Sequence, residues 1–422
     1  MRAYGRLIRL SAIAVGTGLV LLGCTPAPPE PKPTGSPSPS ATAEPVAYDG
    51  PMMFVGDEID DFLLSPEEIA DLLPDVSEVT EPFDGTEMYA DGSGEQYEPA
   101  ICQALLLEQQ VRATGARSVE WKVGDSDELG PGTLRVIQLG SVGQAEERIE
   151  QLREAADGCA SFQGDGASTF TDIATVERDN VRALAGVLRV NASSYDWNAF
   201  YAYAQVGNVL VQIVHEFAGA TTFASDRIAR ALADRAEEAS EALMAKLTAD
   251  PPTIEEPESI SPDMAVADWP TVFGAVGPIV LGEDAEQAAA RVTGAEVTET
   301  LRNTVVVTLA ESAGRMRLDV GEDGEVRTIE VGGHFSEAKQ QGSALPQAEG
   351  VRVGDSLSQA MVAFPEGSTL RLISAGTDVY VIADRAGRVI MFSSEMDETA
   401  AGDKPISSIT VDDASVWTYF RL

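Results

Sequence analysis

The spacing of apolar and capping residues predicts helices in the first half of the chain. The segment Ser65-Pro66-Glu67-Glu68 has the form of a capping box and begins a short helix that ends near Leu73. A second capping box, Ser141-Val142-Gly143-Gln144, begins a helix that extends to Asp157. From Ser225 to Leu247 apolar residues, many of them alanine, recur at helical spacing and predict a long amphipathic helix.

Alternating apolar and polar residues predict strands between these helices. The strands cover residues 118–123, 133–139, 169–177 and 186–192. The clearest hairpin joins residues 199–206 to residues 209–217, because Gly207-Asn208 between them is typical of a tight turn. Residues 75–99, rich in Gly, Asp and Glu, are predicted to form a loop. Helices mixed with antiparallel strands indicate an α+β fold, with helices packed on an antiparallel sheet.

The last third of the chain contains one pattern twice. Ile279-Val280-Leu281-Gly282 precedes a predicted helix over residues 284–292, and Val351-Arg352-Val353-Gly354 precedes one over residues 356–364. Each helix is followed by two strands with a glycine-containing turn between them, 316–320 with 326–331 and 379–383 with 389–393. One helix with a small antiparallel sheet is too small to be stable alone, so the two copies should pack together or share a continuous sheet.

The N-terminus has the three parts of a secretory signal. Arg2, Arg6 and Arg9 precede a short apolar run from Leu10 to Leu22, which ends at Leu21-Leu22-Gly23-Cys24. This end resembles the lipobox of bacterial lipoproteins. The resemblance implies cleavage after Gly23 and acylation of the Cys24 sulfur, so membrane lipid is the expected partner of the N-terminus. The alternative is an ordinary secretory signal with a chance cysteine.

Changes in composition divide the rest of the chain. A proline-rich segment cannot form a core and acts as an extended tether, and a second proline-rich, acidic segment separates two folded parts. The predicted division is 1–23 leader, 24–50 tether, 51–249 first domain, 250–263 linker and 264–422 duplicated domain.

The charge of the chain excludes some partners. It has 29 basic and 68 acidic residues, and its formal net charge is −39. So negative a surface repels nucleic acid and anionic headgroups, and it favours solubility, cationic partners or loosely held divalent ions.

The cysteines indicate one crosslink. With Cys24 assigned to lipid, Cys102 and Cys159 are the only possible internal pair. A protein outside the membrane is in an oxidising environment, so a disulfide between them is predicted.

The sequence offers little catalytic or metal-binding chemistry. His215 shares a strand face with apolar residues and is predicted to be a hydrogen-bonded core or groove residue, and His334 is predicted to be a solvated loop residue. No histidine or cysteine spacing is typical of a metal site. Residues 319–324 faintly resemble a calcium-binding loop but lack its alternating oxygen ligands, so a hairpin turn is predicted there. We therefore expect no enzymatic activity, no cofactor and no metal site.

An aromatic cluster marks the predicted ligand site. Aromatic residues alternate along the strand over residues 199–206, so one set should be buried and the other set can line a groove. Cross-strand aromatic packing in the core is the alternative. The candidate groove residues are Trp121, Trp197, Tyr201, Tyr203 and His215.

Two parts of the chain resemble known families. The capped start at Ser65, the cysteine at position 102, the segment Ser141-Val142-Gly143-Gln144 and the helix that ends at Gly158-Cys159 resemble the extracellular sensor domain of PknH-type kinases. This domain also occurs in actinobacterial lipoproteins. The resemblance implies an antiparallel sheet with helices, a disulfide and a ligand groove. The duplicated part is similar to the tandem repeats of β-lactamase inhibitory proteins and to small outer-membrane assembly lipoproteins, which implies a protein-binding role.

Together these features predict a lipid-anchored protein on the extracytoplasmic face of the cell membrane. It would act as a non-catalytic sensor that binds an envelope ligand or protein. The alternative is a protein inhibitor or envelope-assembly factor that acts through the duplicated domain. An envelope hydrolase that depends on His215 is a third class, for which we expect no activity.

Overall fold

The computed structural model describes residues 47–88, 97–106, 112–124, 129–164, 166–192, 196–253, 257, 260–261, 264–292, 294, 296–300, 304–309, 314–333, 342–372, 376–395 and 404–417. The chain from Val46 to Leu422 forms one compact unit. Cys24, the predicted leader, most of the predicted tether and His334 lie outside the described residues, so their predicted roles stay predictions.

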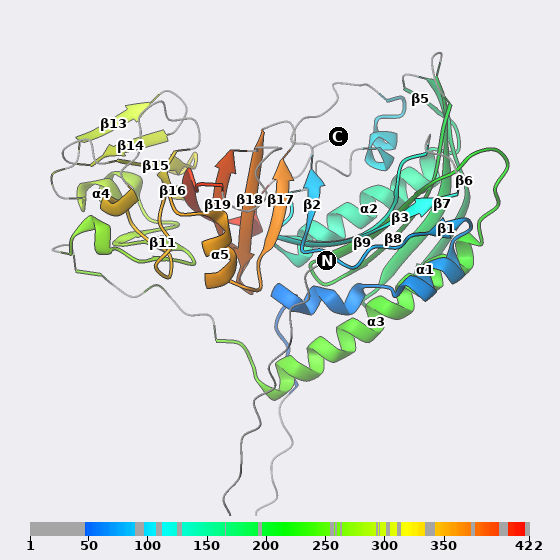
Figure 1. Ribbon diagram of the computed structural model, residues 1–422, viewed down its shortest axis with the longest axis horizontal. Helices are drawn as coiled ribbons and strands as arrows, with labels where there is room; N and C mark the ends of the chain where they lie inside the picture. The colour runs from blue at the N-terminus through cyan, green and yellow to red at the C-terminus, as the bar shows by residue number, and fades with distance from the viewer. Residues whose placement is uncertain are drawn as a thin grey trace, which may run out of the picture. The chain divides into compact units, whose positions relative to one another are not determined.

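Eight strands of the described chain form a first sheet in which all neighbours are antiparallel (Figure 1). In spatial order they are β1 (Val76–Ser77), β3 (Gly115–Val123), β4 (Gly132–Gln138), β9 (Val209–Glu216), β8 (Asp196–Val206), β7 (Arg182–Ala192), β6 (Gly166–Glu177) and β5 (Phe162–Gln163). The predicted hairpin is confirmed as β8–β9, and Gly207 adopts a positive φ of 53° in its turn. The mixture of helices and antiparallel strands confirms the α+β class.

Helices cover both faces of this sheet. On one face α3 (Ser225–Ala249), α1 (Pro66–Leu72) and the 3₁₀ helix η1 (Gly56–Phe62) enclose the larger core. On the other face α2 (Val142–Gly158) and η2 (Ala100–Leu105) enclose a second core that contains the predicted Cys102–Cys159 disulfide. None of the described helices is long and apolar enough to cross a membrane.

The two predicted capping boxes differ. At α1 both bonds form, since Ser65 Oγ accepts from Glu68 N at 3.2 Å and Glu68 Oε2 accepts from Ser65 N at 2.7 Å. At α2 only the serine bond forms, with Gln144 N donating to Ser141 Oγ at 3.3 Å. The side chain of Gln144 instead donates to the backbone carbonyl oxygens of Ala414 and Trp417, at 2.8 and 2.9 Å.

The duplicated part contributes to a second sheet, which contains nine strands within the described ranges. In spatial order they are β13 (Glu296–Thr300), β14 (Thr304–Thr308), β15 (Arg315–Val320), β16 (Val326–Gly332), β20 (Ser408–Asp413), β19 (Arg388–Glu395), β18 (Thr377–Ala383), β17 (Ser368–Leu372) and β2 (Gly85–Met88). The two copies therefore share a continuous sheet, which is one of the two arrangements predicted from the sequence. The prediction of small sheets was wrong in extent, because β20 joins the strand pairs of both copies edge to edge.

Short elements complete the duplicated part. Helices α4 (Ala285–Ala290) and α5 (Leu357–Ala363) pack on one face of the second sheet and enclose its core. A small sheet of β10 (Thr271–Val272), β11 (Ala275–Val276) and β12 (Ile279–Val280) precedes α4. The predicted hairpin turn after β15 is confirmed, with Gly324 at a φ of 87°.

Strand β2 belongs to the second sheet although its residues lie between β1 and β3 of the first sheet. It pairs in parallel with β17 (Figure 1). The prediction of a continuous loop over residues 75–99 was therefore wrong at β1 and at β2. Gly85 is required for this pairing, because a Cβ atom there would lie 2.1 Å from the carbonyl oxygen of Thr369.

Arg117 and a small apolar core join the same two sheets. The Arg117 guanidinium donates to Asp60 Oδ1 at 2.6 Å and to Ser368 Oγ at 3.0 Å, and its side chain is 2% exposed. Residues from β3, β4 and α2 pack against residues from β17, β18 and β19, namely Ala116, Ile137, Ala145, Leu370, Val381 and Val389. Residues from both sides of the predicted 250–263 linker thus build one junction.

Candidate functional site

Trp121 and His215 contact each other in the core beneath α3. Each is 1% exposed, and Trp121 Nε1 donates a hydrogen bond to His215 Nδ1 at 3.1 Å. Burial lowers the pKa of His215 to about 4, although the charge of Asp75 acts to raise it. The imidazole is therefore neutral at pH 7, and Trp121 occupies its accepting nitrogen.

Tyr201, Tyr203 and Trp197 lie on the opposite face of the first sheet. The rings of Tyr201 and Tyr203 stack with centroids 5.9 Å apart, and Trp197 meets Tyr201 edge-on at 6.3 Å. Trp197 Nε1 donates to Glu216 Oε1 at 2.8 Å. Both tyrosines are buried in the core with the disulfide, and Trp197 is half-buried against that core.

The five candidate groove residues therefore do not share one surface. They form two clusters on opposite faces of the first sheet, and helices cover each face. The aromatic packing that the sequence offered as the alternative occurs on both sides. A role of these residues in ligand binding stays a prediction.

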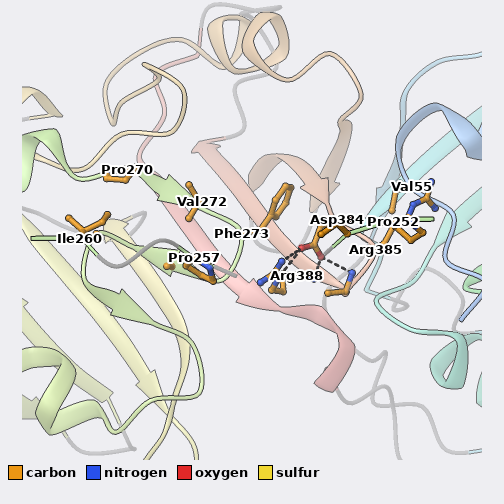
Figure 2. A pocket seen from close by; sticks show the side chains of 14 residues that line it. Val55, Pro252, Pro257, Ile260, Pro270, Val272, Phe273, Asp384, Arg385 and Arg388 are labelled. Atoms are coloured by element: carbon orange, nitrogen blue, oxygen red, sulfur yellow. Dashed lines mark hydrogen bonds and ion pairs between the residues drawn. The ribbon is translucent and has the colours of Figure 1, made fainter. Parts of the chain in front are cut away.

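A cavity of about 710 Å³, here called the large cavity, lies between the predicted linker, the segment before η1 and the duplicated part (Figure 2). Its walls come from the segment before η1, the linker, the β10–β11 hairpin and the β18–β19 turn. Its lining is mainly apolar, with Val55, Pro252, Pro257, Ile260, Pro270, Val272 and Phe273 among the contributing residues. A cavity of this volume and composition is typical of small-molecule sites.

The β18–β19 turn brings charged groups to the edge of the large cavity. Asp384 Oδ2 accepts from Arg388 Nε at 2.7 Å, and Asp384 Oδ1 accepts from the backbone N–H groups of Ala386 and Arg388, each at 2.9 Å. Figure 2 shows the Asp384–Arg388 pair, which lines the same cavity as Phe273. The apolar wall thus ends at a polar turn, and the hydrogen bonds to the Asp384 carboxylate stabilise the conformation of this turn.

Arg385 in the same turn connects the large cavity to the first half of the chain. It donates to the backbone carbonyl oxygen of Met53 and to Glu58 Oε1. Burial acts to raise the pKa of Glu58, but hydrogen bonds from Arg385, Lys246 and the backbone of Val55 together lower this pKa below its ordinary value. Glu58 therefore remains ionised and holds Arg385 at this edge.

A second cavity, here called the small cavity, adjoins the large one. Its volume is about 230 Å³, and Phe273 lines both cavities. Its lining combines apolar residues, three buried polar residues and the exposed Glu366; besides Phe273 it consists of Gly56, Thr114, Gln138, Ala363, Phe364, Pro365, Glu366, Ser368, Val381, Ile382 and Ala383. Thr114, Gln138 and Ser368 are each 2% exposed, whereas Pro365 and Glu366 are exposed. The two cavities together are called the crevice below.

The sequence gives only weak signals for the crevice. Its walls come from segments that lie far apart in the chain and meet only through the pairing of β2 with β17 and the packing of the two sheets. Gln138 carries one weak signal, because it is a polar residue between apolar neighbours, Ile137 and Leu139, at the end of a predicted strand. Phe273, next to Gly274 in a short segment between two predicted elements, carries none.

Comparison with known proteins gives little further information. The chain matches no protein family model and no curated protein. It is similar to the crystal structure of the extracellular domain of PknH from Mycobacterium tuberculosis, at 13% identity and a TM-score of 0.31, over 48% of this chain and 100% of that one. It is also similar to an uncharacterised protein of Mycobacterium smegmatis, the Rv0999 ortholog, at 13% identity and a TM-score of 0.26, over 44% and 96% of the two chains.

Sequence identities and TM-scores this low do not indicate a function. The predicted resemblance of the first half to PknH thus has a weak structural counterpart, and the predicted resemblance of the duplicated part stays a prediction. Within the described part of the chain, no three His, Cys, Asp or Glu side chains are grouped so that they could hold a metal ion.

Proposed function

We propose that this chain is a non-catalytic binding protein of the cell envelope and that its ligand occupies the crevice. The observation that carries this proposal is the large cavity of about 710 Å³, with an apolar wall that ends at the fixed Asp384–Arg388 turn. Apolar walls with a few placed polar groups favour the binding of a small organic molecule.

The groups that line the crevice favour binding over catalysis. Neither cavity has a histidine or a cysteine among the described residues that line it. The hydroxyl of Ser368 accepts hydrogen bonds from Ala116 N and from Arg117 Nη1, each at 3.0 Å, so it faces hydrogen-bond donors in place of a general base. A serine in these surroundings is poorly placed to act as a nucleophile.

The experiment is to expose the purified protein to a cell-envelope extract, remove unbound material and identify retained small molecules by mass spectrometry. The variant Ala386→Phe places a large ring in the large cavity and should retain less ligand, because Ala386 lines that cavity. The matched control is Ala245→Phe, on the exposed face of α3, which should retain ligand as the unaltered protein does. Retention of no small molecule, or equal retention by Ala386→Phe, would count against the proposal.

The proposed location follows from the first 24 residues. We infer that Cys24 carries acyl chains that hold the protein on the extracytoplasmic face of the membrane, since two chains anchor a protein stably where one does not. Mass spectrometry of the native protein should find a lipid-modified N-terminal cysteine and no leader. The variant Cys24→Ser should leave the membrane fraction, and an unmodified Cys24 would contradict the inference.

A further inference from the structure

The small cavity contains a buried amide that is not used by the fold. Gln138 is 2% exposed, and its side chain makes no hydrogen bond with any residue within the described ranges. Its backbone carbonyl oxygen does accept, from Thr114 N at 2.8 Å and from Thr114 Oγ1 at 3.3 Å. A buried amide without partners in the protein must pair with water or with a ligand group in the cavity beside it, so Gln138 marks the small cavity as a place for a polar ligand group.

The surroundings of Gln138 differ from those of the other buried glutamines. Gln205, also 2% exposed, donates through Nε2 to the carbonyl oxygen of Gly207 at 2.9 Å, and Gln144 donates to carbonyl oxygens of the C-terminal segment. Gln138 Oε1 instead lies beside Gly115, and Gln138 and Ser368 both line the small cavity. Gln144 and Gln205 thus use their Nε2 groups in the fold and leave only Oε1 unpaired, whereas neither end of the Gln138 side chain is used by the fold and the residue lines the small cavity.

The polar groups of the small cavity define a complementary ligand. A glutamine side chain offers N–H donors and a carbonyl acceptor side by side, and a ligand that uses both must present an acceptor and a donor in the same arrangement. Ser368 Oγ already accepts two hydrogen bonds, which leaves its own O–H group as a donor toward the cavity. An amide group has the matching carbonyl oxygen and N–H group.

The charge and volume of the small cavity favour a neutral amide. Glu366 is the only charged residue that lines it among the described residues, and this side chain lies at the exposed rim. A charged ligand group would therefore lose its hydration without a buried partner of opposite charge. The cavity of about 230 Å³ has room for roughly seven waters, and its apolar residues, such as Phe364 and Ile382, can surround a methyl group.

We propose that the small cavity binds the amide of an N-acetylated ligand through Gln138 and Ser368, with the acetyl methyl against Phe364 and Ile382. The remainder of the ligand would extend past Phe273 into the large cavity, since this residue lines both. The inference rests on the proposed binding function and adds the chemical class of the ligand. The same acetamido chemistry occurs in N-acetylated amino sugars and in acylated peptides.

The test compares amides with analogues that lack the amide, by calorimetric titration of the purified protein. N-acetylglucosamine is compared with glucose, and N-acetylalanine methylamide is compared with methyl O-acetyl-lactate, in which oxygen replaces each N–H group. At least one amide should bind about tenfold more tightly than its analogue, because the analogue leaves the Gln138 carbonyl unpaired. The pair that shows this difference identifies the sugar or the peptide as the source.

The variant Gln138→Met removes the amide and keeps the size of the side chain. It should weaken amide binding about tenfold and leave the melting temperature of the free protein unchanged or higher, since no internal hydrogen bond is lost. The control Gln205→Met should lower the melting temperature and leave binding unchanged, because Gln205 holds Gly207. If Gln138→Met does not fold, Gln138→Glu keeps the shape and removes the donor, and it should also weaken binding.

Equal affinity for amides and their analogues, or unchanged binding by the folded Gln138 variant, would overturn the inference. The proposed function can survive that result. In that case an envelope ligand would still be retained by the unaltered protein and lost from Ala386→Phe, while the Gln138 variant retains it.

Discussion

The buried Trp121–His215 pair gives the protein a sensitivity to acid that can be calculated from its geometry. His215 is 1% exposed, and burial lowers its pKa from 6.5 to about 4. The unfolded chain therefore binds a proton below pH 6.5 that the folded protein does not bind until about pH 4. His215 leaves the free energy of unfolding unchanged above pH 6.5, the pKa of the unfolded chain. It lowers this free energy as the pH falls from 6.5 toward about 4, the pKa in the folded protein.

The magnitude follows from the two pKa values. The free energy of unfolding should fall by about 2 kcal/mol between pH 7 and pH 5 and by about 3 kcal/mol at pH 4, from His215 alone. The variant His215→Gln removes the titrating group and keeps an oxygen that can accept from Trp121 Nε1. All other titrating groups stay in both proteins, so the difference between their stabilities isolates His215.

The assay is urea unfolding followed by circular dichroism at pH 7, 6 and 5. Between pH 7 and pH 5, the free energy of unfolding should fall by about 2 kcal/mol more for the unaltered protein than for His215→Gln. A second variant, Trp121→Phe, keeps the histidine and frees its Nδ1 atom, so its acid sensitivity should be smaller than that of the unaltered protein. Parallel stability curves for the unaltered protein and His215→Gln would refute the reasoning.

Two further predictions concern stability. The double variant Cys102→Ser, Cys159→Ser should lower the free energy of unfolding by about 4 kcal/mol on the chain-entropy model, because the disulfide joins residues 57 positions apart. Denaturant titration measures this change, and an unchanged unfolding midpoint would contradict it. Gly85→Ala should remove hydrogen-exchange protection from the β17 amides on the β2 side, such as that of Thr369, because the new Cβ would overlap the carbonyl oxygen of Thr369, while the β17 amides that pair with β18 stay protected. The control Gly143→Ala, in α2 with open space around it, should preserve that protection and raise stability by about 0.5–1 kcal/mol.

Local features of the fold were predictable because their causes are local. The capping box at Ser65 and the hairpin at Gly207-Asn208 depend on residues a few positions apart, and both are confirmed. The duplicated pattern left two arrangements open, copies packed together or a shared continuous sheet, and the second of these occurs. Strand β2 was not predictable, because its four residues have no strong strand pattern of their own and pair with β17 from the other half of the chain.

The location of the candidate site could not be predicted for a related reason. Alternation predicted that aromatic residues face both sides of the strand over residues 199–206, but it wrongly grouped Trp121 with Tyr201 in one groove, and it could not show that helices cover both faces. Aromatic residues are equally suited to a core and to a groove, so their type did not decide between the two. Gln138 and Phe273 line a common cavity only because the two halves of the chain pack together, and no local sequence pattern shows this packing.

Strand β2 makes the two halves of the chain interdependent during synthesis. Residues 85–88 leave the ribosome long before residues 368–372, so the early half must keep this strand available until its partner emerges. A fragment that starts at residue 264 lacks β2 and exposes the backbone groups of β17, which are then free to pair with a second copy. Dissection at the linker would therefore yield a self-associating piece, and binding sites are better mapped by point substitutions in the whole protein.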